Sequence, residues 1–130
     1  GEMMSYYLAI DIGASSGRHI LGSIEDGKIK LEEIYRFENG ISKIGDEYCW
    51  DIQGLFNEIK KGIKKCKEIG KVPKNIGIDT WAVDFVLLDE NDEMLGNAVA
   101  YRDDRTDGYM EKAFQVIPQD MLYLYTGIQF

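Results

Sequence analysis

The sequence predicts a mixed α/β fold, and three observations lead to that prediction. Three apolar, strand-like segments come first and are joined by two tight turns. A single long segment with a 3.6-residue apolar period follows them, which indicates an amphipathic helix. Further strand-like segments and two short helical segments complete the chain. The expected order of elements is therefore β-β-β-α-β-β-β-α-α, within one partial domain that spans residues 1–130.

The first three segments are expected to form antiparallel strands. Residues Tyr6–Ile12 are mostly apolar and rich in aromatic and β-branched side chains, and residues 18–24 read as a second strand. The Asp-Gly pair at residues 26–27 is typical of a two-residue hairpin turn. Residues 29–37 then alternate between apolar and polar side chains, with a slip at the Glu pair, residues 32–33. The third strand is therefore expected to be half exposed.

The long helix is expected over residues 51–69, after a loop over residues 38–48. Its apolar side chains recur every three or four positions, at Ile52, Leu55, Phe56, Ile59, Ile63, Cys66 and Ile69. Asp51 can cap the start of this helix, and Gly70 can end it. The lysines near its C-terminal end are expected to form a solvated face, where positive charge is favourable.

The rest of the chain is expected to alternate between strands and helices. Strands are expected over residues 75–79, 82–88 and 94–101, and helices over residues 106–116 and 118–125. Pro118 suits a first helical turn, and Gly127 suits a helix end.

Composition and charge exclude several classes of function. The chain of 130 residues has 23 acidic and 15 basic side chains, for a net charge of −8. Nucleic acid is therefore not expected as a partner, because binding it needs a surplus of Lys and Arg. No apolar run approaches a membrane span, and the opening residues do not resemble a signal peptide, so we expect a cytoplasmic protein. Cys49 and Cys66 lack metal-ligand spacing and are expected to be reduced, structural thiols.

The sequence DIGASSGR, which ends the first expected strand and begins the second, is a candidate phosphate-binding turn. Gly13 and Gly17 allow backbone angles that other residues resist, so the chain can reverse tightly and present N–H groups to a ligand. The two serines between them add hydroxyl donors, and Arg18 adds a positive charge. Such a set of donors can hold a triphosphate, which predicts ATP as the ligand. A plain Gly/Ser turn is the alternative.

Asp11 begins this motif and points to a metal ion. A carboxylate next to a phosphate is repelled unless a cation lies between them, so Mg²⁺ is the expected companion. The motif lacks the G-K-[ST] of a Walker A loop. A strand instead of a helix is expected after the turn, so a dinucleotide-binding fold is also excluded.

A second candidate segment is GIDTWAVDFVLL, in which two carboxylates lie close to a tryptophan. Asp79 and Asp84 each need a partner if they are buried, such as a backbone N–H, a basic side chain or a ligand hydroxyl. An exposed face of Trp81 beside carboxylates would suit a sugar. The alternative is that Trp81 belongs to the core and Asp84 caps a turn. Arg102 and Arg105 in YRDDRT are candidates to pair with these carboxylates or to bind an anion.

Together these segments resemble the FGGY carbohydrate kinases of the actin-like ATPase superfamily, from Tyr7 to Phe130. The resemblance rests on DIGASSGR, RFENG, WDI, GIDTWAVDFVLLDE, AVAYRDDRT and TGIQF. Within the family, DTWAVDF is most similar to the L-rhamnulose kinases. The resemblance implies an actin-like (ribonuclease H-like) fold with a mixed sheet that starts with three antiparallel strands and has helices packed on it. It also implies transfer of the γ-phosphoryl group of ATP to the 1-hydroxyl of L-rhamnulose, with Mg²⁺.

The resemblance also implies roles for particular residues. The expected phosphate-binding residues are Gly13, Ala14, Ser15, Ser16, Gly17 and Arg18, and Asp11 is expected to serve the metal ion. The residue after Trp81, here Ala82, is implied to touch the sugar. With the residues singled out above, the expected sugar-binding residues are Asp79, Trp81, Ala82, Asp84 and Arg102. Ala82 departs from the family pattern, in which a glycine is expected at this position.

In this family the general-base aspartate lies further along the chain, which places it beyond Phe130. The adenine site belongs to a second, C-terminal domain. We therefore expect the sequence to be the N-terminal part of a sugar kinase. On its own it should bind ATP poorly, show no turnover and expose apolar surface. The alternatives are a kinase for another ketose or deoxysugar, and a non-catalytic sugar- or nucleotide-sensing module of actin-like fold.

Overall fold

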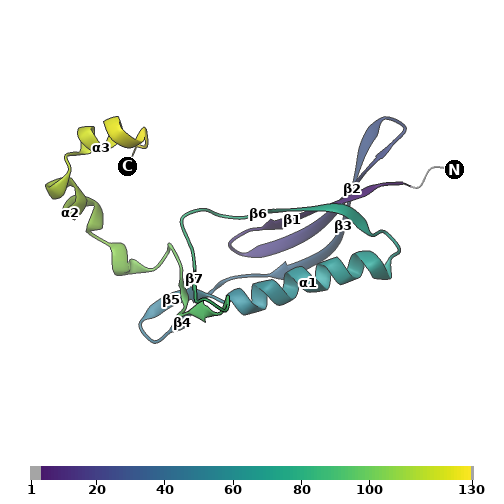
Figure 1. Cartoon of the computed structure of the whole chain (residues 1–130), viewed down its shortest axis with the longest axis horizontal. Helices are drawn as coiled ribbons and strands as arrows, with labels where there is room; N and C mark the ends of the chain where they lie inside the picture. Colours follow the sequence, from purple (N-terminus) through teal and green to yellow (C-terminus); the bar gives the residue numbers. More distant parts are fainter. Residues whose placement is uncertain (1–3, 130) are drawn as a thin grey trace.

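The computed structural model describes residues 4–129, and its elements follow the expected α/β order with additional short strands (Figure 1). The strands are β1 (Tyr6–Ile12), β2 (Ser16–Glu25), β3 (Lys28–Glu38), β4 (Ile41–Ile44), β5 (Glu47–Trp50), β6 (Pro73–Asp79), β7 (Leu87–Leu88), β8 (Met94–Leu95) and β9 (Ala98–Val99). The helices are α1 (Ile52–Glu68), α2 (Tyr109–Val116), α3 (Gln119–Thr126) and a 3₁₀ turn, η1 (Asp104–Thr106).

The main sheet has the strand order β3-β2-β1-β6. Strands β1, β2 and β3 are antiparallel neighbours, as the sequence predicts, and β6 lies parallel to β1. Helix α1 runs along one face of this sheet (Figure 1). The core between them contains Leu8, Ile10, Ile12, Leu21, Phe37 and Cys66, all buried. The mixed sheet with a covering helix confirms the predicted fold class.

The turn between β2 and β3 has the predicted hairpin geometry. Asp26 and Gly27 both have positive φ angles, 51° and 75°, as a two-residue turn of this kind requires. The expected slip in β3 is also present. The register shifts between the pairs His19–Tyr35 and Ile20–Glu33, so β3 carries one extra residue there.

Helix α1 has the expected caps and packs closely on β2. The carboxylate of Asp51 accepts a hydrogen bond from the N–H of Gly54 at 2.9 Å, and Gly70 adopts a φ of 71° just after the helix ends. The fully buried ring of His19 donates a hydrogen bond from Nε2 to the carbonyl of Ile59 at 3.2 Å. A Cβ atom at Gly62 would overlap this ring, so glycine there lets the helix approach the sheet.

The prediction of a loop over residues 38–48 is wrong. Strands β4 and β5 form a hairpin there, and β5 also pairs with β9, about fifty residues further along the chain. These strands are short, and their partner β9 is distant in sequence. Local composition, rich in glycine and polar residues, therefore gave no strand signal.

The predicted strand over residues 82–88 is also wrong for most of its length, because only Leu87–Leu88 is extended and paired. Val83 has a φ of 70°, which is incompatible with a strand and strained for a β-branched residue. The predicted strand over residues 94–101 is divided into β8 and β9, with Gly96 at a φ of 80° between them.

Helices α2 and α3 extend away from the sheet (Figure 1). They begin and end within three residues of the predicted positions, and Gly127 adopts the left-handed conformation at the end of α3. Neither helix has a buried residue. Among residues 4–129, no helix is both long and apolar enough to cross a membrane. Phe130, the last residue of the TGIQF motif, lies outside the described residues.

The sheet also exposes apolar side chains, as the sequence predicts. Ile29 and Leu31 of β3 are 76% and 68% exposed, and Ile76 and Ile78 of the edge strand β6 are 46% and 56% exposed. The apolar surface of this sheet is therefore only partly covered by residues 4–129.

Candidate functional site

The turn between β1 and β2 is closed by one backbone hydrogen bond, from the N–H of Gly13 to the carbonyl of Ser16 at 2.9 Å. Asn39, directly after β3, holds this turn from the other side. Its side-chain Nδ2 donates to the carbonyl of Gly13, and its backbone N–H donates to the carbonyl of Ser15, both at 2.9 Å. The N–H groups of Ala14 and Ser15 have no hydrogen-bond partner within residues 4–129.

The predicted reason for the two glycines of the turn is wrong. Neither Gly13 nor Gly17 has a positive φ, so neither is required for a special backbone angle. Gly17 is buried, and a Cβ atom there would overlap the ring of Phe37 on β3. A Cβ atom at Gly13 would lie 3.1 Å from the carbonyl oxygen of Ser16. Both glycines therefore allow close approach, one to an aromatic ring and one to the turn's own backbone.

Asp11 and Arg18 lie opposite each other on β1 and β2 and form an ion pair of 3.1 Å. Their side chains are 47% and 44% exposed, so both remain accessible to a ligand. Asp11 is also the register partner of Asp79 on the parallel strand β6. Two carboxylates thus lie at the C-terminal ends of two neighbouring parallel strands, at the edge of the sheet where ligands bind in open α/β folds.

Asp84 is the centre of a second cluster of contacts. Its Oδ2 atom accepts hydrogen bonds from Nε1 of Trp50 at 2.6 Å, Nε1 of Trp81 at 2.9 Å and the N–H of Tyr101 at 3.2 Å. The two indole rings lie against each other, with ring centroids 4.1 Å apart. The partners of this half-buried carboxylate are therefore indole and backbone N–H groups, and not an arginine.

The turn and the tryptophan pair belong to one region. Ala14 packs against the buried cluster of Trp50, Ala98 and Ala100, and Trp81 packs against both this cluster and the core beneath α1. A cavity of about 310 Å³ lies beside the tryptophans. It is mostly apolar, and its lining includes Ile12, Trp50, Leu55, Phe56, Trp81, Asp84 and Val86.

The arginines of YRDDRT contact neither Asp79 nor Asp84, so that predicted pairing is wrong. Nε of Arg102 donates to the hydroxyl of Tyr101 at 3.0 Å, and the guanidinium group lies over the same ring. Arg105 instead approaches Asp103 at 4.0 Å. Arg102 therefore contacts the side chain of Tyr101, whose backbone N–H binds Asp84.

Ala82 is exposed, and its φ angle is not positive. The backbone therefore does not require the glycine that the family pattern would place there. The strained residue of this segment is its neighbour Val83.

Asp103 was not singled out by the sequence analysis, although it holds this segment in place. Its buried carboxylate accepts hydrogen bonds from the N–H groups of Tyr48 at 2.7 Å and Arg105 at 2.8 Å. These two bonds lower the pKa of Asp103 below its usual value. A carboxylate in a run of charges resembles a solvated residue, so the sequence offered no signal for its burial.

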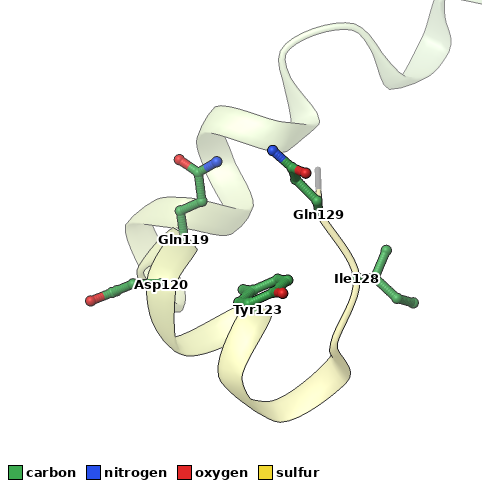
Figure 2. Close-up of a pocket in the computed structure, with 5 residues that line it drawn as sticks. All are labelled: Gln119, Asp120, Tyr123, Ile128 and Gln129. Carbon is green, nitrogen blue, oxygen red and sulfur yellow. The ribbon is translucent and has the colours of Figure 1, made fainter.

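A separate cavity of about 630 Å³ lies on α3 and the residues after it (Figure 2). Tyr123 faces Ile128 and Gln129 across it, and Asp120 points away. It contains none of the predicted site residues. Within the described part of the chain, no group of His, Cys, Asp and Glu side chains could hold a metal ion by itself, and Cys49 and Cys66 are both free and buried.

Comparison with known families identifies the chain. Residues 6–130 match the N-terminal domain of the FGGY family of carbohydrate kinases. The chain belongs to the FGGY family. Relatives in this family include two proteins named rhamnulokinase, from Halalkalibacterium halodurans and Oceanobacillus iheyensis, which are 58% and 55% identical over 98% of this chain. The chain spans 27% of the length of each.

Solved structures show the same fold at low sequence identity. A gluconate kinase from Lactobacillus acidophilus superposes with a TM-score of 0.77 and 16% identity, over 97% of this chain and 25% of that one. A xylulose kinase from the same organism gives a TM-score of 0.72 and 15% identity, over 92% of this chain and 24% of that one. These two kinase structures therefore share the mixed α/β fold of this chain.

Proposed function

We propose that this chain is the N-terminal part of an ATP-dependent kinase that phosphorylates the 1-hydroxyl group of L-rhamnulose. The observation that carries the proposal is its 58% identity to a protein named rhamnulokinase, over nearly the whole of this chain. The geometry of the turn and the tryptophan cluster supports it, because both lie in the segments that carry the resemblance.

The turn is proposed to bind the phosphates of ATP. Its unpartnered N–H groups at Ala14 and Ser15 are suited to phosphate oxygens, and so are the hydroxyls of Ser15 and Ser16, which make no hydrogen bond within residues 4–129. Arg18 adds a charged donor at the same edge. Gly13 and Gly17 let the backbone pack closely enough to form the turn.

Asp11 fits the role of a magnesium ligand. Mg²⁺ binds through one or two carboxylates, with water and substrate phosphates completing its shell. Asp11 is such a carboxylate, half exposed and directly before the turn. The cation would neutralise charge on the transferred phosphoryl group. The ion pair with Arg18 holds Asp11 at the site until the ligands bind.

The sugar is proposed to lie near Trp81, Ala82 and Asp84. The Trp81 ring supplies an apolar face, and Asp84 keeps that ring fixed through its hydrogen bond. Asp79 and Arg102 are proposed to complete the polar contacts. Because Asp84 already accepts three hydrogen bonds through Oδ2, only its other oxygen is available to a sugar hydroxyl.

Catalysis is proposed to need the rest of a longer protein. Phosphoryl transfer depends on positioning and electrostatic stabilisation from both sides of a cleft. The proposed general base and adenine site lie outside this sequence. Such a kinase would act in the cytoplasm, where ATP is available.

The test is a coupled assay of the full-length protein with a panel of ketoses and deoxysugars. L-rhamnulose is expected to give the highest kcat/KM, and the 130-residue chain alone is expected to give no turnover. Preference for another sugar would assign the protein to a different acceptor. Steady phosphorylation by the 130 residues alone would contradict the proposed division of the site.

A further inference from the structure

Asn39 contacts the β1–β2 turn, although Asn39 lies outside the DIGASSGR motif that forms this turn. It follows the last residue of β3 and lies 26 residues from Gly13 in the sequence. Its Nδ2 group donates to the carbonyl of Gly13 and its backbone N–H to the carbonyl of Ser15, each at 2.9 Å. Two of the carbonyl groups of the turn are thus held toward β3.

These two bonds also determine where N–H groups point. A trans peptide is planar, and its C=O and the following N–H point in opposite directions. No cis peptide bond occurs in residues 4–129. Because the carbonyl of Gly13 faces Asn39, the N–H of Ala14 must point away from it. The carbonyl of Ser15 directs the N–H of Ser16 in the same way.

We propose that Asn39 is a positioning residue for phosphate binding, which rests on the function proposed for the turn. Its side chain holds the peptide between Gly13 and Ala14 with the N–H outward. Without that bond the peptide is less restrained, and a rotated peptide would present the carbonyl oxygen to a phosphate. The Ala14 N–H has no partner among residues 4–129, so it is available to bind an anion.

Asparagine is suited to this position because it combines a neutral donor with a short side chain. Aspartate has the same shape but cannot donate to Gly13 when ionised, and its charge would oppose both the carbonyl and the phosphates. Alanine removes the donor without adding charge and keeps the backbone bond to Ser15. The two variants therefore separate the loss of the hydrogen bond from the effect of a new charge.

The experiment compares Asn39→Asp and Asn39→Ala with the wild-type full-length protein. The readouts are KM for ATP, KM for L-rhamnulose, and inhibition by inorganic tripolyphosphate and by adenosine. Asn57→Asp is the matched control, since Asn57 lies on the exposed side of α1. Within residues 4–129 its only side-chain bond comes from Gln53, and Asn57 accepts it through an oxygen that aspartate retains. Thermal unfolding of every variant reports on folding.

Asn39→Ala is expected to raise KM for ATP and the inhibition constant of tripolyphosphate by about three- to tenfold, the equivalent of one net hydrogen bond. Asn39→Asp should raise both further. KM for the sugar and inhibition by adenosine, which has no phosphate, should not change. A merely structural role would instead alter all four values together with the unfolding temperature.

The outcomes separate this inference from the function on which it rests. Wild-type turnover with unchanged tripolyphosphate inhibition in Asn39→Ala would overturn the role of Asn39 alone. A wild-type protein that neither phosphorylates a sugar nor binds tripolyphosphate would overturn the proposed function and this inference with it. If Asn39→Asp does not fold, the Asn39→Ala variant decides the question.

Discussion

Asp84 and Trp50, 34 residues apart in the sequence, are joined by a hydrogen bond of 2.6 Å from the indole Nε1 to the carboxylate Oδ2. The same oxygen accepts the indole N–H of Trp81 at 2.9 Å. One carboxylate therefore binds both tryptophans of the chain, whose rings lie against each other at an angle of 34°. This contact links the hairpin of β4 and β5 to the segment proposed to bind the sugar.

Replacing Asp84 by Asn is expected to loosen the tryptophan pair. Hydrogen bonds to a charged acceptor become bonds to a neutral one, which should lower the free energy of unfolding by about 1–2 kcal/mol. Because both tryptophans lie at this site, their fluorescence spectrum should shift, and urea titration should give the stability loss. Asp46→Asn is the control, because Asp46 lies at an exposed turn position and its side chain makes no hydrogen bond within residues 4–129. An unchanged spectrum and midpoint for Asp84→Asn would refute this role.

Gly62→Ala is expected to destabilise the protein by about 1–3 kcal/mol, because its Cβ would overlap the His19 ring and force α1 away from β2. Gly40→Ala is the matched change, since no atom lies within 4 Å of a Cβ built there and its φ is not positive. Chemical denaturation of both variants measures the difference. Equal free energies of unfolding for Gly62→Ala and Gly40→Ala would show that α1 can move away from β2 without loss of stability.

The stability of the fold should depend on pH through His19. Burial lowers its pKa below the usual 6.5, opposed in part by the hydrogen bond to Ile59 and the charge of Glu58. The unfolded chain then takes up a proton at a pH where the folded chain does not. The contribution of neutral His19 to the free energy of unfolding is therefore fully present above pH 6.5 and is lost as the pH falls below that value.

The measurement is the urea midpoint at pH 7.5 and 5.5, for the wild type and for His19→Gln. The wild type should lose stability between these values, and the variant should lose less. Glu58 and Asp103 have ordinary pKa values of 4.5 and 3.8, and both are lowered in the folded chain. Their effects on stability therefore appear only at lower pH. A slope that persists unchanged in His19→Gln would assign the effect to another group.

Asp11→Asn should affect activity far more than stability. An exposed ion pair contributes only about 0–1 kcal/mol, so the loss of the contact with Arg18 should leave the unfolding temperature nearly unchanged. Turnover of the full-length protein should fall by at least about a hundredfold, and the Mg²⁺ concentration for half-maximal rate should rise, if Asp11 serves the metal. Asp107→Asn is the control. Normal Mg²⁺ dependence in Asp11→Asn would exclude the metal role.

The 130-residue chain should self-associate through its exposed sheet. Leu31 on β3 and Ile78 on β6 are 68% and 56% exposed, and exposed apolar surface of this kind promotes association. Leu31→Lys and Ile78→Lys should each shift the chain toward monomer in light scattering after size-exclusion chromatography. Val116→Lys, on exposed α2, is the control for added charge. A wild-type chain that is monomeric at high concentration would contradict the prediction.

Local sequence signals were sufficient to predict those features that depend on neighbouring residues. The Asp-Gly turn, the slip in β3 and the cap at Asp51 were predicted because each depends on backbone angles or bonds within a few residues. The short strands β4, β5 and β9 were missed for the opposite reason. They are extended because they pair with each other across the chain, and pairing of that range leaves no periodic signal in so few residues.

Some features of the candidate site could likewise be predicted from the sequence, and others could not. The sequence by itself determined the family, the mixed sheet and the segments that carry the site, since apolar periodicity and motif residues are properties of the chain alone. Only the tertiary structure decided that Gly17 makes room for Phe37, that Asn39 holds the turn and that Asp84 binds two indoles. Except for the bond between Asp84 and Trp81, each of these is a contact between residues 20 or more positions apart, which exists only after the strands have packed.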